Sequence, residues 1–111
     1  MRQTFGQHIK TGRVKKGYSQ RTLAELVGVD HSYLSKIEND SSEYPPKPIV
    51  IRRLARYLKL DAIELTYLSG RIPPADAKII QALAKQYKKK LPVLLRALKN
   101  KKLVEQILDE K

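Results

Sequence analysis

Apolar residues recur at every third or fourth position along this chain, and proline interrupts the pattern at three places. Such spacing puts apolar side chains on one face of an α-helix, whereas a half-buried strand needs strict alternation, which is absent here. Proline disfavours helix continuation because it lacks a backbone donor and restricts the residue before it. The pattern therefore predicts an all-α chain of short helices, with breaks at residues 45–48, 73–74 and 92.

Capping residues locate the ends of these helices. Ser19 and Asp30 precede apolar runs as N-caps, and Gly28 follows one where a left-handed backbone favours glycine. Asp61 and Glu64 have the spacing of a capping box. The expected helices are 4–15, 20–27, 31–38, one beginning at Pro48, 62–69, 75–89, one beginning at Pro92, and 103–108, with a break near Asn100.

The apolar residues divide the chain into two parts. Residues 1–71 supply enough of them to close a five-helix core, so we expect a domain there and a helical C-terminal extension over residues 72–111. The expected core of the domain is Phe5, Ile9, Leu23, Val27, Leu34, Ile37, Ile51, Leu54, Leu58 and Ile63. In the extension, we expect the helix at 75–89 to bury Ile79, Ile80, Leu83 and Tyr87.

Charge indicates the kind of partner. The chain has 23 Lys and Arg against 11 Asp and Glu, a net charge of +12 that favours polyanions, above all nucleic acid. A soluble basic protein without that role is the alternative. Residues 1–71 and 72–111 each carry a net +6, so the shorter extension is the denser in positive charge.

Other composition features exclude several classes of protein. The chain has no Cys and two His far apart, so we expect no disulfide, no metal site and no cofactor. A Gly-rich phosphate loop and a nucleophile with an evident base are also absent, which argues against an enzyme. With no apolar run of membrane-spanning length and no visible signal peptide, we expect a cytoplasmic, nucleoid-associated protein without a membrane partner.

Residues 20–39 carry the strongest functional signal. Two short helices are joined by a turn centred on Gly28, and Ala24 is small where the helices must cross closely. Apolar residues face a shared core at Leu23, Val27, Val29, Leu34 and Ile37. This is the arrangement of a helix-turn-helix, whose second helix enters the major groove of DNA. An ordinary helical hairpin is the alternative, which the six matching positions in twenty disfavour.

These residues resemble a known family. The pairs 19–20, 23–24 and 28–29 and the run 32–39 are similar to the lambda-repressor-like, Xre-type helix-turn-helix family, and residues 54–61 resemble its fourth and fifth helices. The resemblance covers about residues 4–70 and implies a five-helix domain that binds operator DNA as a homodimer. Two departures are a longer, proline-rich segment at 41–48 and the extension, which has no counterpart in the minimal domain.

Candidate DNA contacts follow from the second helix of the motif. His31, Ser32 and Lys36 point away from its apolar side and are the expected base readers, with Lys36 suited to guanine O6 and N7. The expected backbone or supporting contacts are Ser19, Gln20, Arg21, Tyr33, Asn39 and Lys47. The resemblance implies that Gln20 both contacts the backbone and locks a reading side chain. For Tyr33, packing over the preceding helix stays open, as does a solvated role for Arg21 and Lys47.

One ion pair is expected from periodicity alone. Arg13 lies on the apolar stripe of the first helix, and Glu38 lies on that of the third. A lone charge on an apolar face is unfavourable, so the two charges indicate each other as partners that hold the helices together. Exposure of either charge to solvent is the alternative.

Together these features predict a sequence-specific DNA-binding transcriptional regulator, a repressor that binds a palindromic operator as a homodimer. One alternative is an antitoxin that binds its own operator and grips a toxin through residues 72–111. Another is a coactivator module that bridges proteins and binds DNA without sequence preference. The extension is open to three roles: packing on the domain, forming a dimer interface, or holding another protein. Its cations Lys85, Lys88, Lys89 and Lys90 are either contacts to flanking phosphates or a solvated face.

Overall fold

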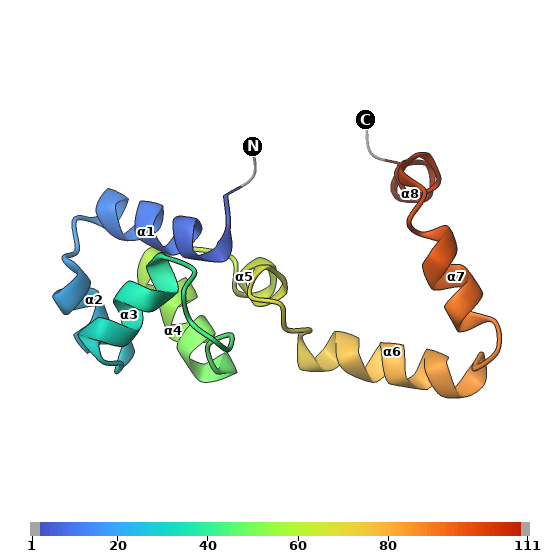
Figure 1. Cartoon of the computed structure of the whole chain (residues 1–111), viewed down its shortest axis with the longest axis horizontal. Coiled ribbons are helices and arrows are strands. Elements are labelled where there is room, and N and C mark those ends of the chain that lie inside the picture. The colour runs from blue at the N-terminus through green and yellow to red at the C-terminus, as the bar shows by residue number, and fades with distance from the viewer. Residues whose placement is uncertain (1–2, 110–111) are drawn as a thin grey trace. The chain divides into compact units, whose positions relative to one another are not determined.

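The computed structural model describes residues 3–109, and within that range every regular element is a helix (Figure 1). This confirms the all-α fold. The described helices are α1 (Phe5–Lys16), α2 (Gln20–Val27), α3 (His31–Glu38), α4 (Pro48–Leu58), α5 (Ala62–Leu68), α6 (Pro74–Gln86), α7 (Leu91–Ala97) and α8 (Lys101–Leu108).

The helices form two compact units that divide between Pro73 and Pro74. We call Met1–Pro73, which holds α1 to α5, the N-terminal unit, and Pro74–Lys111, which holds α6 to α8, the C-terminal unit. Pro74, the second of two consecutive prolines at the division, disfavours helical backbone at the residue before it, so α6 begins at Pro74.

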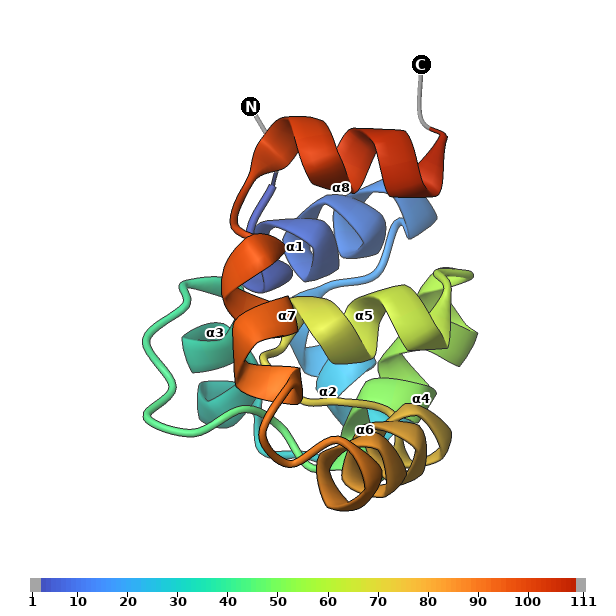
Figure 2. The same ribbon diagram turned by 90° about the vertical axis from the view of Figure 1, so that its right-hand side faces the viewer.

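Within the N-terminal unit, α1 packs across α3 and α4, while α2 packs against α3 and α4 (Figure 1). Figure 2 shows α5 beside α4, and it shows the long loop between α3 and α4 swinging outward before it returns to Pro48. The core between these helices consists of Phe5, Ile9, Leu23, Ala24, Val27, Leu34, Ile37, Val50, Ile51, Leu54, Ala55, Leu58 and Leu65.

Helix ends follow the capping chemistry in most places. Thr4 and Gln7 form a full capping box at the start of α1, and Gly17 ends that helix at a φ of 78°. Ser19 accepts a hydrogen bond from the backbone N–H of Thr22, as expected of an N-cap. Asn100 caps α8 in the same way and marks the expected break in the extension.

Two expected caps differ in detail. Asp30 occupies the N-cap position of α3, but its carboxylate makes no capping bond and instead accepts a long 3.5 Å bond from the Ser32 hydroxyl. Asp61 accepts from the N–H groups of Ile63 and Glu64, so only its half of the expected capping box forms. Short polar side chains choose among several nearby hydrogen-bond partners, and sequence spacing alone does not reveal which one they take.

The expected core is correct except at Ile63. That side chain is 61% exposed, whereas Leu65, two residues later, is 2% exposed and completes the core. The reason is the phase of α5: Ala62 and Leu65 lie three residues apart on the face that packs inward, and Ile63 is turned about 100° from Ala62. In a helix of seven residues, one position of phase decides which apolar side chain is buried.

The expectation that Ile79, Ile80, Leu83 and Tyr87 are buried is wrong for the single chain, because they are 38–59% exposed. No described residue of α6, α7 or α8 is buried. Figures 1 and 2 both show α8 at the far end of α7 from α6, so these helices follow one another without forming a bundle. Within the C-terminal unit their apolar faces therefore lack a covering layer.

Helix α6 also ends three residues earlier than expected, at Gln86. The carbonyl of Tyr87 accepts hydrogen bonds from the N–H groups of Lys90 and Leu91, at 2.9 and 2.7 Å. These bonds form a tight turn in place of a last helical turn. Helix α7 then begins at Leu91, one residue before the expected Pro92.

Candidate nucleic-acid interface

The turn between α2 and α3 holds the two helices of the motif in close contact. Gly28 adopts a φ of 76°, and the N–H of Val29 reaches the carbonyl of Ala24 at 2.9 Å. A Cβ at Gly28 would also lie 2.9 Å from a guanidinium nitrogen of Arg53. Glycine is therefore favoured here by the left-handed backbone, and a larger residue would also displace the end of the Arg53 side chain.

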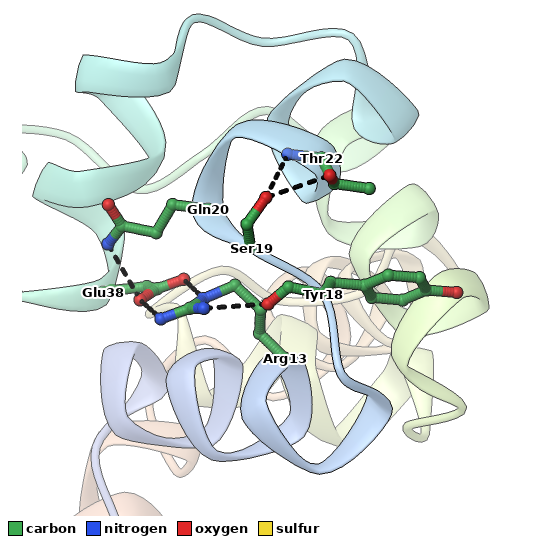
Figure 3. A network of polar contacts seen from close by, with 6 residues as sticks. All are labelled: Arg13, Tyr18, Ser19, Gln20, Thr22 and Glu38. Carbon is green, nitrogen blue, oxygen red and sulfur yellow. Dashed lines mark hydrogen bonds and ion pairs between the residues drawn. The ribbon is translucent and has the colours of Figure 1, made fainter.

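Arg13 and Glu38 form an ion pair between α1 and α3 (Figure 3). The Arg13 Nε lies 2.7 Å from Glu38 Oε2, and its Nη2 lies 3.1 Å from Oε1. The third arm of the guanidinium donates to the carbonyl of Tyr18 at 2.9 Å. The Glu38 side chain is only 1% exposed, so this two-bond pairing compensates a carboxylate that has lost nearly all of its water.

Gln20 completes this buried network. Its amide nitrogen donates to Glu38 Oε1 at 3.1 Å, which ties the first residue of α2 to the last residue of α3 (Figure 3). The network therefore joins α1, α2 and α3 through one carboxylate. Gln20 is half-buried, and the amide oxygen is not used in this bond.

Ser19 is engaged locally. Its hydroxyl accepts from the Thr22 N–H at 3.0 Å and lies 2.9 Å from the Thr22 hydroxyl, to which it donates (Figure 3). A phosphate contact by this hydroxyl would have to replace the bond to the Thr22 side chain.

The outward side of α3 is open to solvent. His31, Ser32 and Lys36 are all exposed. Ser32 and Lys36, four residues apart, lie on the side of α3 opposite Leu34 and Ile37, whereas His31 lies at the edge between that side and the buried one. Ser35 lies among them and is half-buried, and the sequence reasoning missed it. Its spacing, four residues after His31 and three after Ser32, was the signal that could have found it.

The other expected DNA contacts differ in their exposure to solvent. Tyr33 is half-buried and packs against the core, which is the alternative left open for it. Asn39 is exposed and ends α3, where its own N–H bonds to the carbonyl of Ser35. Arg21 on α2 is exposed, and Lys47 is exposed just before α4.

Two sets of long-range hydrogen bonds, which the sequence pattern did not predict, hold the loop after α3. Asp40, at a φ of 55°, accepts from the N–H of Gly6 at 2.9 Å and from the Thr4 hydroxyl. Arg71, from the end of the N-terminal unit, donates to the carbonyl oxygens of Pro46 at 2.7 Å and Pro45 at 3.2 Å. The loop that follows α3 is thereby fastened at its beginning to α1 and near its end to the segment after α5.

A third contact fixes the end of α2. Arg53 of α4 donates to the carbonyl of Val27 at 3.2 Å. A cation at a helix C-terminus satisfies a free carbonyl and complements the helix dipole.

The described residues give no sign of a metal centre, because no three His, Cys, Asp or Glu among them are grouped to hold an ion. None of the described helices combines the length and the apolar character needed to cross a membrane.

Comparison with known proteins identifies relatives of the whole arrangement. A helix-turn-helix family model matches residues 9–65, just over half of the chain. The HTH-type transcriptional regulator SinR of Bacillus subtilis (strain 168) is 34% identical over 82 residues, which cover 69% of this chain and 74% of that protein.

Two solved structures are also similar. The structure of SinR, the master regulator for biofilm formation, in complex with DNA is 37% identical, with a TM-score of 0.51 over 56% of this chain and 97% of that chain. The SinR–SinI protein complex is 27% identical, with a TM-score of 0.51 over 96% of this chain and 92% of that chain. The second likeness therefore extends into α6, α7 and α8.

Proposed function

Because the chain belongs to the lambda-repressor-like, Xre-type helix-turn-helix family of DNA-binding transcriptional regulators, we propose that it is a repressor that places α3 in the major groove of a specific operator. One observation carries the proposal. One side of α3 is buried through Leu34, Ile37 and Glu38, and the other presents polar side chains to solvent. A helix held so rigidly can offer the same polar groups to the groove each time it binds.

The proposed base readers are His31, Ser32 and Lys36, joined by Ser35. The ammonium group of Lys36 suits the guanine O6 and N7 acceptors, while the hydroxyl groups can donate or accept. The exposure of His31, Ser32 and Lys36 supports this assignment.

The proposed backbone contacts surround that face. Gln20 uses its amide nitrogen on Glu38, which leaves its oxygen and second N–H for a neighbouring reader or a phosphate. Ser19, Arg21, Tyr33, Asn39 and Lys47 are the remaining proposed contacts to phosphate. For Tyr33 only the phenolic end is available, because its ring packs against the core.

We further propose that residues 1–71 bind DNA and that residues 72–111 bring two chains together. The support is the uncovered apolar surface of α6 and α7, where Ile79, Ile80, Leu83, Leu94 and Leu98 are 38–59% exposed. A homodimer would cover this surface and would present two copies of α3 to a palindromic operator in the cytoplasm, at the nucleoid.

Selection of bound sequences from a random DNA pool tests the proposal. We expect an enriched palindrome whose half-sites are spaced by about one helical turn. Failure to enrich any sequence would contradict operator binding and would favour the bridging-module alternative, which predicts sequence-indifferent binding. A single unpaired site would retain DNA recognition but reject the symmetric dimer.

A truncation after Pro73 tests the role of the extension. It retains Arg71 and its clamp on the α3–α4 loop. We expect a folded monomer whose operator binding is weaker and depends steeply on protein concentration, because the dimer contact is lost. A truncated chain that stays dimeric in solution would show that α6 to α8 do not join the two copies.

A second candidate function is supported by the likeness to the SinR–SinI complex, which spans 96% of this chain. The apolar surface of the extension would then hold a different small protein, as in an antitoxin that grips its toxin. Co-purification of one defined small protein with the full chain, and its loss after truncation at Pro73, is the expected result. Retention of that protein by the truncated chain would reject the extension as its binding site.

A further inference from the structure

The C-terminal unit has a long stretch of one charge sign. Between Asp76 and Glu105 the sequence has nine Lys and Arg and no Asp or Glu. All nine cations are exposed: Lys78, Lys85, Lys88, Lys89, Lys90, Arg96, Lys99, Lys101 and Lys102. A surface with so large an excess of positive charge attracts a polyanion.

Three of these cations border a hollow. The turn between α6 and α7 borders a solvent-open hollow of about 360 Å³ lined by Gln86, Tyr87, Lys88, Lys89 and Lys90. The turn is fixed by the two backbone bonds that converge on the carbonyl of Tyr87. The side chains of Lys88, Lys89 and Lys90 therefore extend from one short segment whose backbone is fixed by hydrogen bonds.

The hollow also contains an oriented neutral donor. The amide nitrogen of Gln86 donates to the Tyr87 hydroxyl oxygen at 3.2 Å. Because the oxygen accepts this bond, the hydroxyl proton remains available to an anion. Phosphate oxygens of DNA are bound by this combination, with lysine as a point charge and tyrosine as a neutral donor.

The basic and apolar faces of α6 are separate. Lys78 and Lys85 are seven residues apart and share one side of the helix, while Ile79 and Leu83, four residues apart, share another. Coverage of the face that holds Ile79 and Leu83 by a second copy or another protein would leave Lys78 and Lys85 accessible to an anion.

We propose that the Gln86–Lys90 turn binds a backbone phosphate of the DNA that flanks the operator. This rests on the proposed DNA-binding function and extends the contact beyond the α3 site. Only residues 69–73 connect α5 to α6, so DNA held by the N-terminal unit is present at high effective concentration for the cations of the other unit. A distant acidic protein lacks that advantage.

The test uses the full chain and two matched variants. One replaces Lys88, Lys89 and Lys90 with Gln, and the control replaces Lys99, Lys101 and Lys102 with Gln, which removes the same charge outside the hollow. Dissociation constants are measured over a range of salt concentrations. One duplex contains only the selected operator, and a second extends it by about 10 bp on each side.

We expect the hollow variant to bind the long duplex several-fold more weakly and to lose about 0.9 from the log–log salt slope for each phosphate contact removed. On the short duplex it should match the wild-type chain. A Tyr87→Phe chain should show a smaller loss on the long duplex only. The substituted lysines are exposed, so the thermal midpoint should not change.

The other outcomes separate this proposal from the function on which it rests. If the wild-type chain prefers no sequence, the operator-binding function fails. If the wild-type chain binds its operator and the hollow variant has the same affinity and slope on the long duplex, only the phosphate site is overturned. Equal losses of affinity in the two triple variants would also overturn it, because they would show that DNA is attracted by the overall positive charge of the unit and not by the hollow. Unchanged DNA binding with altered self-association or partner binding would assign the lysines to a protein contact instead.

Discussion

The two units of this chain carry equal net charge but handle their apolar residues in opposite ways. The N-terminal unit buries thirteen hydrophobic side chains, while no described residue of the three C-terminal helices is buried. Helices of seven to thirteen residues are marginal in isolation and depend on packing of their apolar faces. The difference teaches that the N-terminal unit has a closed core of its own, whereas the described helices of the C-terminal unit do not close one among themselves.

The units also use carboxylates differently. In the N-terminal unit Glu38, Asp40 and Asp61 each hold a helix end or a helix pair. In the C-terminal unit the acidic residues stand near the two ends of the sequence, and the middle is purely basic. Carboxylates therefore form structural hydrogen bonds in the N-terminal unit, whereas the middle of the C-terminal unit has only positively charged side chains.

The largest expected effect comes from the buried pair of the complete unit. Arg13→Ala should destabilise the fold by about 3–5 kcal/mol, because it leaves the Glu38 carboxylate buried without its cation. Urea or thermal unfolding of the full chain measures this. Replacement of both residues by Leu should cost much less, and an unchanged midpoint in the single variant would contradict the importance of the pair.

A matched pair of leucine truncations tests the comparison directly. Leu54→Ala in the N-terminal core should cost about 2–5 kcal/mol through lost burial and a cavity. Leu94→Ala in the exposed C-terminal unit should change the stability of dilute, monomeric protein by no more than about 0.5 kcal/mol. Equal losses in monomeric samples would show that the C-terminal unit has a closed core after all.

Measurements of DNA binding should distinguish a base contact made by the N-terminal unit from a phosphate contact made by the C-terminal unit. Lys36→Ala should cost about 1–3 kcal/mol at one base position in each half-site, because the proposed contact is to a base edge. Lys85→Ala serves as the control. It should either weaken binding equally on all DNA sequences or leave binding unchanged. A Lys36→Ala loss that is the same on operator and random DNA would make Lys36 a phosphate contact.

The smallest expected effect concerns Arg71, close to the boundary between the units. Arg71→Ala removes the donors to Pro45 and Pro46 and should cost about 1 kcal/mol of stability. It should also speed protease cleavage in residues 39–47, which limited digestion with mass detection would locate. Arg71→Lys keeps the charge but not the planar fork, so only partial rescue is expected. Cleavage at the wild-type rate in the Ala variant would mean that the loop is held by Asp40 alone.

Local patterns predicted much of the N-terminal unit. Apolar spacing and caps placed α1, α2 and α3 within about one residue, because those signals act between near neighbours in the chain. The Arg13–Glu38 pair was detectable since each charge interrupts an apolar stripe. The contacts of Asp40 and Arg71 were not, because a side chain that meets a backbone group 25 or 34 residues away leaves no periodic trace.

Two other errors have a common physical origin. Ile63 was misplaced because one position of phase decides burial in so short a helix, and the apolar residues of α6 were expected to be buried although no other helix of their own unit packs over them. In both cases an apolar side chain was assumed to be covered because it is apolar. Which neighbour covers it is a property of tertiary or quaternary packing that the pattern does not contain.

The division of α3 into a buried and an exposed side has a consequence for how such regulators diversify. Leu34, Ile37 and Glu38 hold the helix, while the proposed readers His31, Ser32 and Lys36 are exposed to solvent. Substitutions among the readers should therefore leave folding almost untouched. After gene duplication, a copy of this protein can acquire a new set of target promoters through a few changes in one helix, with its scaffold inherited intact.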